Sequence, residues 1–209
     1  MRLLLIFFTF IATAYAQDER YFRQILSGQL PVDNDEVIDS PLRTFVVKGK
    51  SYLVDLNGDG IDETLQPLKV DGLDALEIFD SSMRKLFHAK LPAAGSDANL
   101  YKIKLVHISK TVKTLILFLD EGKTDGKKFE ATARIYLLTY EDNELSTLKL
   151  TKGPHFFHEK EAQREQYYRR DYLVNVYDID LDGTREVSIQ YNHIQRIMKY
   201  KSKGEWVEY

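Results

Sequence analysis

An all-β fold is the class that the sequence predicts, and three observations predict it. From Thr44 onward, short runs rich in β-branched and aromatic residues are separated by turn residues. Between Tyr101 and Leu105, apolar residues alternate with lysines, which is typical of a strand with one buried face. Leu115 to Leu119 is wholly apolar, and we expect a strand covered on both faces there.

Apart from the first, at 44–48, the strands expected from this pattern form three groups of four. The expected strands are 44–48, 51–55, 64–70, 74–80, 84–90, 100–108, 112–120, 128–140, 144–151, 172–178, 186–193, 195–201 and 205–209. The groups span about 51–90, 100–151 and 172–209, a weak internal repeat of antiparallel, blade-like units. Three propeller-like blades or an open arc would explain the grouping, and a β-sandwich or an ordinary meander would explain it equally well. The charged stretch 159–170 is expected to be a helix or a long excursion.

The first residues have the pattern of a signal peptide. A short positive start, Met1-Arg2, precedes an apolar run and the cleavage pattern Ala14-Tyr15-Ala16. The run is shorter than the roughly 20 apolar residues needed to cross a bilayer. We therefore expect residues 1–16 to be removed, export to a bacterial periplasm or the extracellular space, and no integral membrane segment in the mature chain.

The mature chain is predicted to consist of a lead-in and one β domain. Residues 17–43 hold a short amphipathic helix, from Asp18 to Ser27, followed by an acidic segment, and residues 44–209 form the single domain. The chain has no cysteine, so neither a disulfide nor a thiol nucleophile is available. Its formal net charge of −3 argues against a nucleic acid partner.

Two Asp-rich segments, each between expected strands, are the strongest candidate site. Both read D-x-[DN]-x-D-G-x-x-E. The predicted metal ligands are Asp55, Asn57, Asp59, the Ile61 carbonyl and Glu63 in the first loop, and Asp178, Asp180, Asp182, the Thr184 carbonyl and Glu186 in the second loop.

The spacing of these residues suits calcium, a hard cation that takes about 6–8 oxygen ligands. Side chains at positions 1, 3 and 5 of a tight loop turn inward, and the glycine at position 6 permits the sharp bend. An EF-hand is excluded because position 12 is Gln66 in one loop and Ile189 in the other, and because the flanks are strand-like. A polar hairpin turn without an ion would use the same residue types.

At these residues the chain resembles the FG-GAP and VCBS repeat families. Their repeats carry D-x-[DN]-x-D-G-x-x-D between the first two strands of a β-propeller blade, and the loop binds calcium. The stretches Ser51–Leu91 and Tyr172–Tyr209 look most like such repeats. The closing acid here is glutamate instead of aspartate, and the middle group has Ile108-Ser109-Lys110-Thr111 where the loop would be.

No catalytic constellation is visible in the sequence. His155 and His158 lie three residues apart without a third ligand, so we expect a loop with two aromatic anchors there and no transition metal. The resemblance implies an exported binding or interaction module with structural calcium and a protein or carbohydrate ligand. An exported hydrolase with an unidentified acidic site, and an oligomeric envelope or structural protein, are the alternatives.

Overall fold

The computed structural model describes residues 43–93, 95, 97–124, 129–161 and 167–209. The regular structure of these residues consists of β-strands in antiparallel sheets, which confirms the all-β class. The predicted signal peptide and the predicted N-terminal helix lie outside the described residues. Within the described ranges, no helix has the length and hydrophobicity needed to span a membrane.

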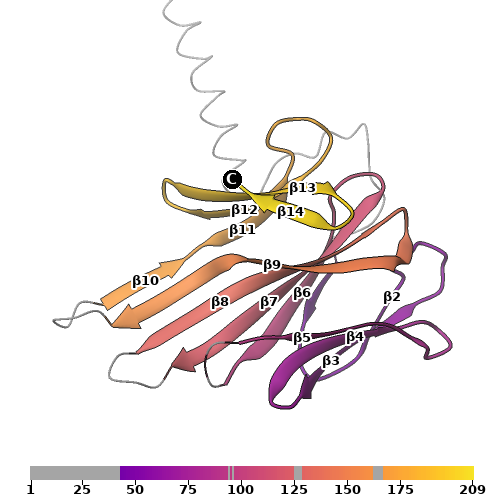
Figure 1. The fold of residues 1–209 in the computed structure, drawn as a ribbon, viewed down its shortest axis with the longest axis horizontal. Coiled ribbons are helices and arrows are strands. Elements are labelled where there is room, and N and C mark those ends of the chain that lie inside the picture. Colours follow the sequence, from indigo (N-terminus) through magenta and orange to yellow (C-terminus); the bar gives the residue numbers. More distant parts are fainter. Residues whose placement is uncertain (1–42, 94, 96, 125–128, 162–166) are drawn as a thin grey trace, which may run out of the picture. The chain divides into compact units, whose positions relative to one another are not determined.

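Two of the three sheets are meanders of four consecutive strands, and the third contains a meander of five (Figure 1). One four-stranded sheet comprises β2 (Tyr52–Val54), β3 (Glu63–Val70), β4 (Leu73–Phe79) and β5 (Lys85–Leu91). The other comprises β11 (Leu173–Tyr177), β12 (Glu186–Tyr191), β13 (Ile194–Ser202) and β14 (Glu205–Glu208).

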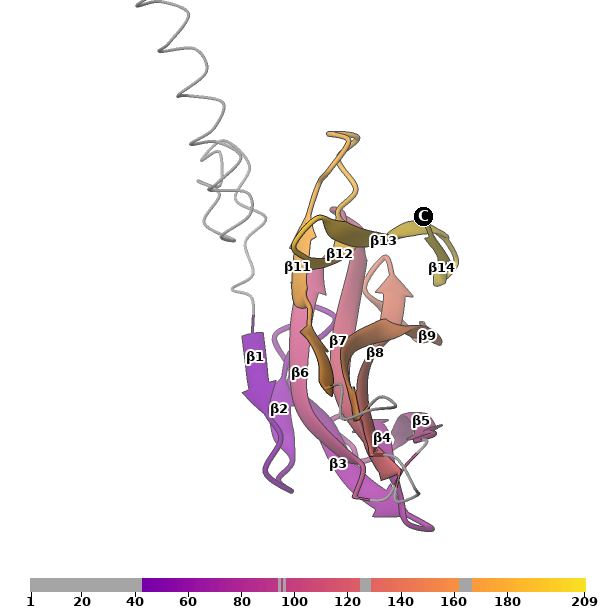
Figure 2. The same ribbon diagram turned by 90° about the vertical axis from the view of Figure 1, so that its left-hand side faces the viewer.

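The third sheet has six strands in the order β1-β6-β7-β8-β9-β10. Its strands are β1 (Arg43–Val46), β6 (Asn99–His107), β7 (Val112–Thr124), β8 (Glu130–Glu141), β9 (Glu144–Glu161) and β10 (Tyr167–Asp171). Figure 2 shows β1 alongside β6, at the edge of the sheet. The turn between β8 and β9 places Asp142 and Asn143 at φ 52° and 61°, the geometry that suits the twist of a tight hairpin.

The six-stranded sheet is covered on both faces, because its strands contribute alternate residues to two separate cores. Along β7, Leu115, Leu117 and Leu119 pack with residues of β2–β5. Ile116 and Phe118 pack with residues of β12, β13 and β14. All five side chains are buried, so the prediction of a strand covered on both faces is confirmed.

A buried polar contact ties the last sheet to the central one. Thr114 and Thr139 lie on β7 and β8 with their hydroxyl oxygens 2.9 Å apart. The indole Nε1 of Trp206, on β14, donates to the Thr139 hydroxyl at 2.9 Å. Because the three groups are buried, each depends on the others for hydrogen bonding.

The expectation for residues 159–170 is wrong for the part that the structure describes. Residues up to Glu161 continue β9, and Tyr167–Asp171 form β10, which pairs with β9. His155 and His158 therefore lie on a strand and not in a loop. Cross-strand pairing of Glu159 with Arg169 lets this charged segment form a solvated ribbon.

Candidate metal loops and a polar pocket

The two Asp-rich segments occupy the same place in their sheets. The first loop, residues 55–63, joins β2 to β3, and the second loop, residues 178–186, joins β11 to β12. Each is thus the first hairpin of a four-stranded meander.

The two loops share one scheme of backbone hydrogen bonds. In the first loop, the amide of Gly60 donates to Asp55 Oδ2 at 2.9 Å, and the amide of Ile61 donates to Asp59 Oδ1 at 2.7 Å. The equivalent bonds in the second loop are Gly183 N to Asp178 Oδ2 at 2.8 Å and Thr184 N to Asp182 Oδ1 at 2.8 Å. Positions 1 and 5 therefore bend both loops in the same way.

The sharp bends need a left-handed backbone at positions 4 and 6. Gly60 and Gly183 occupy position 6 with φ of 84° and 85°. At position 4, the first loop has Gly58 with φ 81°, whereas the second has Leu181 with φ 58°. A residue with a side chain is strained at such an angle. The backbone at Leu181 is therefore strained in the second loop, whereas the backbone at Gly58 in the first loop is not.

The closing glutamates are buried beneath their loops. Glu63 is 4% exposed and Glu186 is 2% exposed. Their Oε2 atoms accept the amides of Leu56 and Ile179, each at 2.8 Å. Burial raises the pKa of Glu63; the Leu56 amide opposes this rise, and the charges of Asp59 and Asp55 add to it.

Three carboxylates of the second loop converge. One oxygen from each of Asp178, Asp180 and Glu186 lies within 4.8 Å of the others. In the part of the chain that the structure describes, this is the group of acidic and histidine side chains that can hold a metal ion. Glu186 Oε1 is buried and accepts no hydrogen bond, which is the state expected of an oxygen whose partner is a cation.

Other predicted side-chain ligands form hydrogen bonds within the protein and do not belong to this converging group. Asp182 accepts from Lys199 Nζ at 2.9 Å. In the first loop, Asn57 Nδ2 donates to Asp59 Oδ2 at 2.9 Å, so these two side chains bind each other. The first-loop carboxylates do not form a converging group of the kind seen in the second loop, among the residues described. The residues Ile61 and Thr184 lie at position 7 of their loops, and their amides take part in the shared bend.

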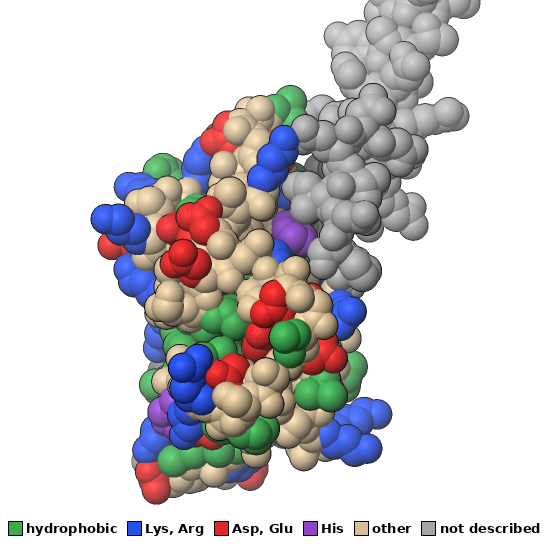
Figure 3. All heavy atoms as spheres, turned by 90° about the vertical axis from the view of Figure 1, so that its right-hand side faces the viewer, with side chains coloured by type: hydrophobic (Ala, Val, Ile, Leu, Met, Phe, Trp, Pro, Cys, Tyr) green, Lys and Arg blue, Asp and Glu red, His purple; other side chains and the backbone are tan. Residues whose placement is uncertain are grey.

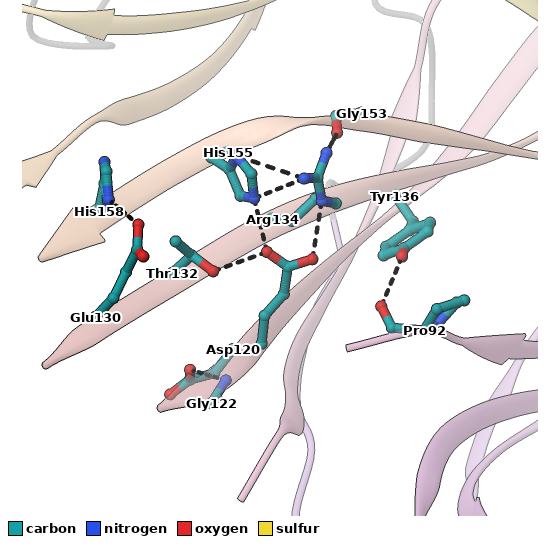
Figure 4. Close-up of polar contacts among 11 residues, drawn as sticks. Pro92, Asp120, Gly122, Glu130, Thr132, Arg134, Tyr136, Gly153, His155 and His158 are labelled. Atoms are coloured by element: carbon teal, nitrogen blue, oxygen red, sulfur yellow. Dashed lines mark hydrogen bonds and ion pairs between the residues drawn. The ribbon is translucent and has the colours of Figure 1, made fainter. Parts of the chain in front are cut away.

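A second polar site, which the sequence did not predict, surrounds Glu121; Figure 4 labels its residues Thr132, Arg134 and His155. Glu121 is 3% exposed, and its Oε1 accepts from Arg134 Nε at 3.0 Å. Its Oε2 accepts from Thr132 Oγ1 at 2.9 Å and from His155 Nε2 at 2.7 Å. Arg134 Nη1 also donates to the Gly153 carbonyl at 2.7 Å. Glu121, Thr132, Arg134 and His155 line a pocket of about 370 Å³ beside the segment after β5.

The Glu121 carboxylate is held in its charged form. Burial alone would raise its pKa, but the hydrogen bonds from His155, Arg134 and Thr132 outweigh burial and lower the pKa to about 2. Irregular pairing turns these side chains toward one another, because β7 shifts register between Asp120 and Lys123. No distinct sequence pattern predicts such a bulge. The one residue that could indicate it is Gly122, which lies in the bulge with φ 81°.

His155 and His158 each bind a carboxylate. His155 contacts Glu121, and His158 Nε2 lies 2.8 Å from Glu130 Oε1. The two histidines therefore contact two different carboxylates. In the space-filling view of Figure 3, acidic side chains lie in small groups, with lysine and arginine side chains around them, so that face carries no continuous basic stripe.

Comparison with family models, with curated proteins and with solved structures finds no match for this chain.

Proposed function

We propose that this chain is an exported binding or interaction module whose two Asp-rich loops hold calcium as a structural ion. The observation that carries the proposal concerns Glu186, whose buried Oε1 accepts no hydrogen bond and whose carboxylate has an oxygen within 4.8 Å of oxygens of Asp178 and Asp180. A buried carboxylate oxygen left without a hydrogen bond costs about 1–3 kcal/mol or more, and a cation that binds this oxygen directly removes that cost.

Calcium is the ion that these ligands suit best. The predicted ligands of both loops are carboxylate, amide and carbonyl oxygens, without the nitrogen or sulfur atoms that zinc and copper prefer. The loops are exposed hairpin turns, and calcium tolerates irregular geometry better than magnesium does. The shared hydrogen-bond scheme supports extending the proposal from the second loop to the first.

A propeller-like build is the arrangement that we propose for the strands. Three antiparallel meanders, two of four strands and one of five, support it, as does the Asp-rich loop between the first two strands of both four-stranded sheets. The resemblance to FG-GAP and VCBS repeats points the same way. On this basis the chain is an open arc or a three-bladed unit, alone or assembled with further copies.

A protein or carbohydrate is the proposed ligand. The exposed apolar side chains of Ile61, Ile179 and Leu181 lie on the two loops and favour a protein. An exported hydrolase is less well supported. At a pKa of about 2, Glu121 is a weak base and has no proton to donate at neutral pH, so its cluster is suited to holding strands together.

Thermal unfolding in calcium and in chelator tests the proposal. An ion at ten times its Kd adds about 1.4 kcal/mol per site, and extracellular modules bind calcium at about 10⁻⁴–10⁻³ M. Millimolar calcium should therefore raise the melting temperature by several degrees. Asp59→Ala should remove the first loop's share and Asp182→Ala the second's. Asp62→Ala is the matched control, because this exposed acid lies in the first loop outside the predicted ligand set.

The proposed export has its own check. The protein recovered outside the cytoplasm of its host should begin at Gln17, as determined by mass spectrometry of the N-terminal peptide. Recovery with Met1 still present would refute the proposed cleavage. A melting temperature that is the same in calcium and in chelator would refute the proposed calcium sites.

A further inference from the structure

The second loop already contains a cationic group of the chain itself. Lys199 lies on β13, and its ammonium forms ion pairs with three carboxylates of the loop, those of Asp180, Asp182 and Glu186. Its Nζ lies 2.9 Å from Asp182 Oδ2 and 3.6 Å from Glu186 Oε1, and it also donates to Asp180 Oδ2. Two of these three acids, Asp180 and Glu186, belong to the converging group described above.

The ammonium supplies charge without completing the site. At 3.6 Å, Lys199 Nζ is too far from Glu186 Oε1 for a hydrogen bond, and that buried oxygen remains without one. A lysine ammonium has three donors, whereas a calcium ion takes about 6–8 oxygens at roughly 2.3–2.6 Å. The same carboxylates would hold calcium closer and on more sides.

The first loop is different in this respect. Its lysine contact comes from the central sheet, where Lys113 Nζ donates to the Leu56 carbonyl at 2.9 Å. Tyr140 donates its hydroxyl to the same carbonyl at 2.7 Å. Lys113 thus supports the backbone of the first loop, while Lys199 occupies the carboxylates of the second.

The side chain of Lys199 can also adopt a second position, in a hollow beside the loop. A hollow of about 370 Å³ adjoins the second loop and is lined by Ile179, Asp180, Glu186, Ile197, Lys199 and Tyr209. The lysine side chain is 30% exposed. Its aliphatic stem can lie along Ile197 and Tyr209 while the ammonium reaches water, the usual behaviour of a lysine at an apolar surface.

We infer that Lys199 is a tethered cation that occupies the second loop without calcium and is displaced when calcium binds. This inference rests on the proposed function. A calcium ion among these carboxylates repels the Lys199 ammonium and competes with it for Asp180 and Glu186, so calcium that enters the loop releases Lys199. The second loop therefore binds calcium more weakly than the first, and it keeps its shape when calcium is absent.

Calcium titration of a Lys199→Met variant tests the inference. The Asp59→Ala background removes the first loop, and titration calorimetry then reports on the second loop alone. Lys199→Met should tighten calcium binding at least tenfold, which corresponds to about 1.4 kcal/mol. In chelator, the same variant should melt below its parent. Lys201→Met is the matched control, because this exposed lysine lies two residues along the same strand, and it should change the affinity less than twofold.

A second measurement on the unmodified protein does not depend on the folding of any variant. Acetylation of lysines by acetic anhydride, followed by mass spectrometry, should show Lys199 protected in chelator and at least threefold more reactive in calcium. Lys201 should react equally in both conditions.

The outcomes separate the inference from the proposed function. If wild-type protein binds calcium but neither Lys199→Met nor the acetylation of Lys199 responds, the inference is wrong and the proposed function stands. If calcium binds the second loop only after Lys199→Met, Lys199 blocks that loop and calcium does not displace it, which refutes both the displacement and the proposed calcium site in the second loop. If no variant binds calcium at either loop, both are refuted.

Discussion

Replacing Glu121 with glutamine should destabilise the protein at neutral pH and have little effect in strong acid. The substitution keeps the shape of the side chain but removes the charge that Arg134 and His155 face. The folded pKa is about 2 and the ordinary value is 4.5. Since one pKa unit corresponds to about 1.4 kcal/mol, the charged carboxylate contributes on the order of 3 kcal/mol.

The pH dependence of this loss follows from the direction of the pKa change. A carboxylate whose pKa is lower in the folded state stabilises the fold at every pH above its unfolded pKa. That stabilisation is lost as the pH falls from about 4.5 to about 2, where wild-type Glu121 takes up a proton in the folded protein. The difference between wild type and Glu121→Gln should therefore be largest above pH 5 and shrink toward pH 2.

Urea unfolding at several pH values measures this difference, because urea adds no charge. Glu130→Gln is the matched control: Glu130 lines the same pocket and pairs with His158, but it is half exposed, so its loss should cost less than about 1 kcal/mol. Equal stability of wild type and Glu121→Gln at pH 7 would refute the reasoning. A difference that stays constant from pH 7 to pH 2 would assign the loss to packing instead of charge.

Two further predictions concern other parts of the fold. Leu181→Gly should raise the free energy of unfolding, measured in urea, by about 0.5–1 kcal/mol. Leu181 is 80% exposed and adopts φ 58°, which glycine adopts without strain. A loss of stability would contradict this explanation. Thr139→Val should cost about 1–3 kcal/mol, because Trp206 and Thr114 lose their shared partner, whereas Thr139→Ser should retain most of the stability. A larger loss for Thr139→Ser than for Thr139→Val would show that the methyl group matters and the hydroxyl does not.

The all-β class and most strands could be predicted because their signals are local. The alternation around Ile103 and the apolar run from Leu115 to Leu119 both reflect which faces of a strand are covered. The segment 159–170 was wrongly expected to be a helix or an excursion. Its charges are satisfied by a partner strand, and the sequence alone does not reveal that pairing.

The candidate site could be predicted in part. The spacing identifies Asp178, Asp180 and Glu186, which the fold brings together. The sequence does not show that Lys199 contacts the acids of this loop. Lys199 lies on β13, and the register of β12 against β13 determines that contact. The Glu121 cluster was missed for a similar reason: the residues that satisfy this acid come from two other strands.

The number of calcium ions bound per chain tests the central claim most directly. Calorimetric titration of the protein lacking residues 1–16 should reveal two sites, the weaker of which is lost in Asp182→Ala and the stronger in Asp59→Ala. The double variant should bind no calcium, while Asp62→Ala should bind as wild type does. Absence of calcium binding to wild-type protein at millimolar concentrations would contradict the account and identify both loops as polar turns.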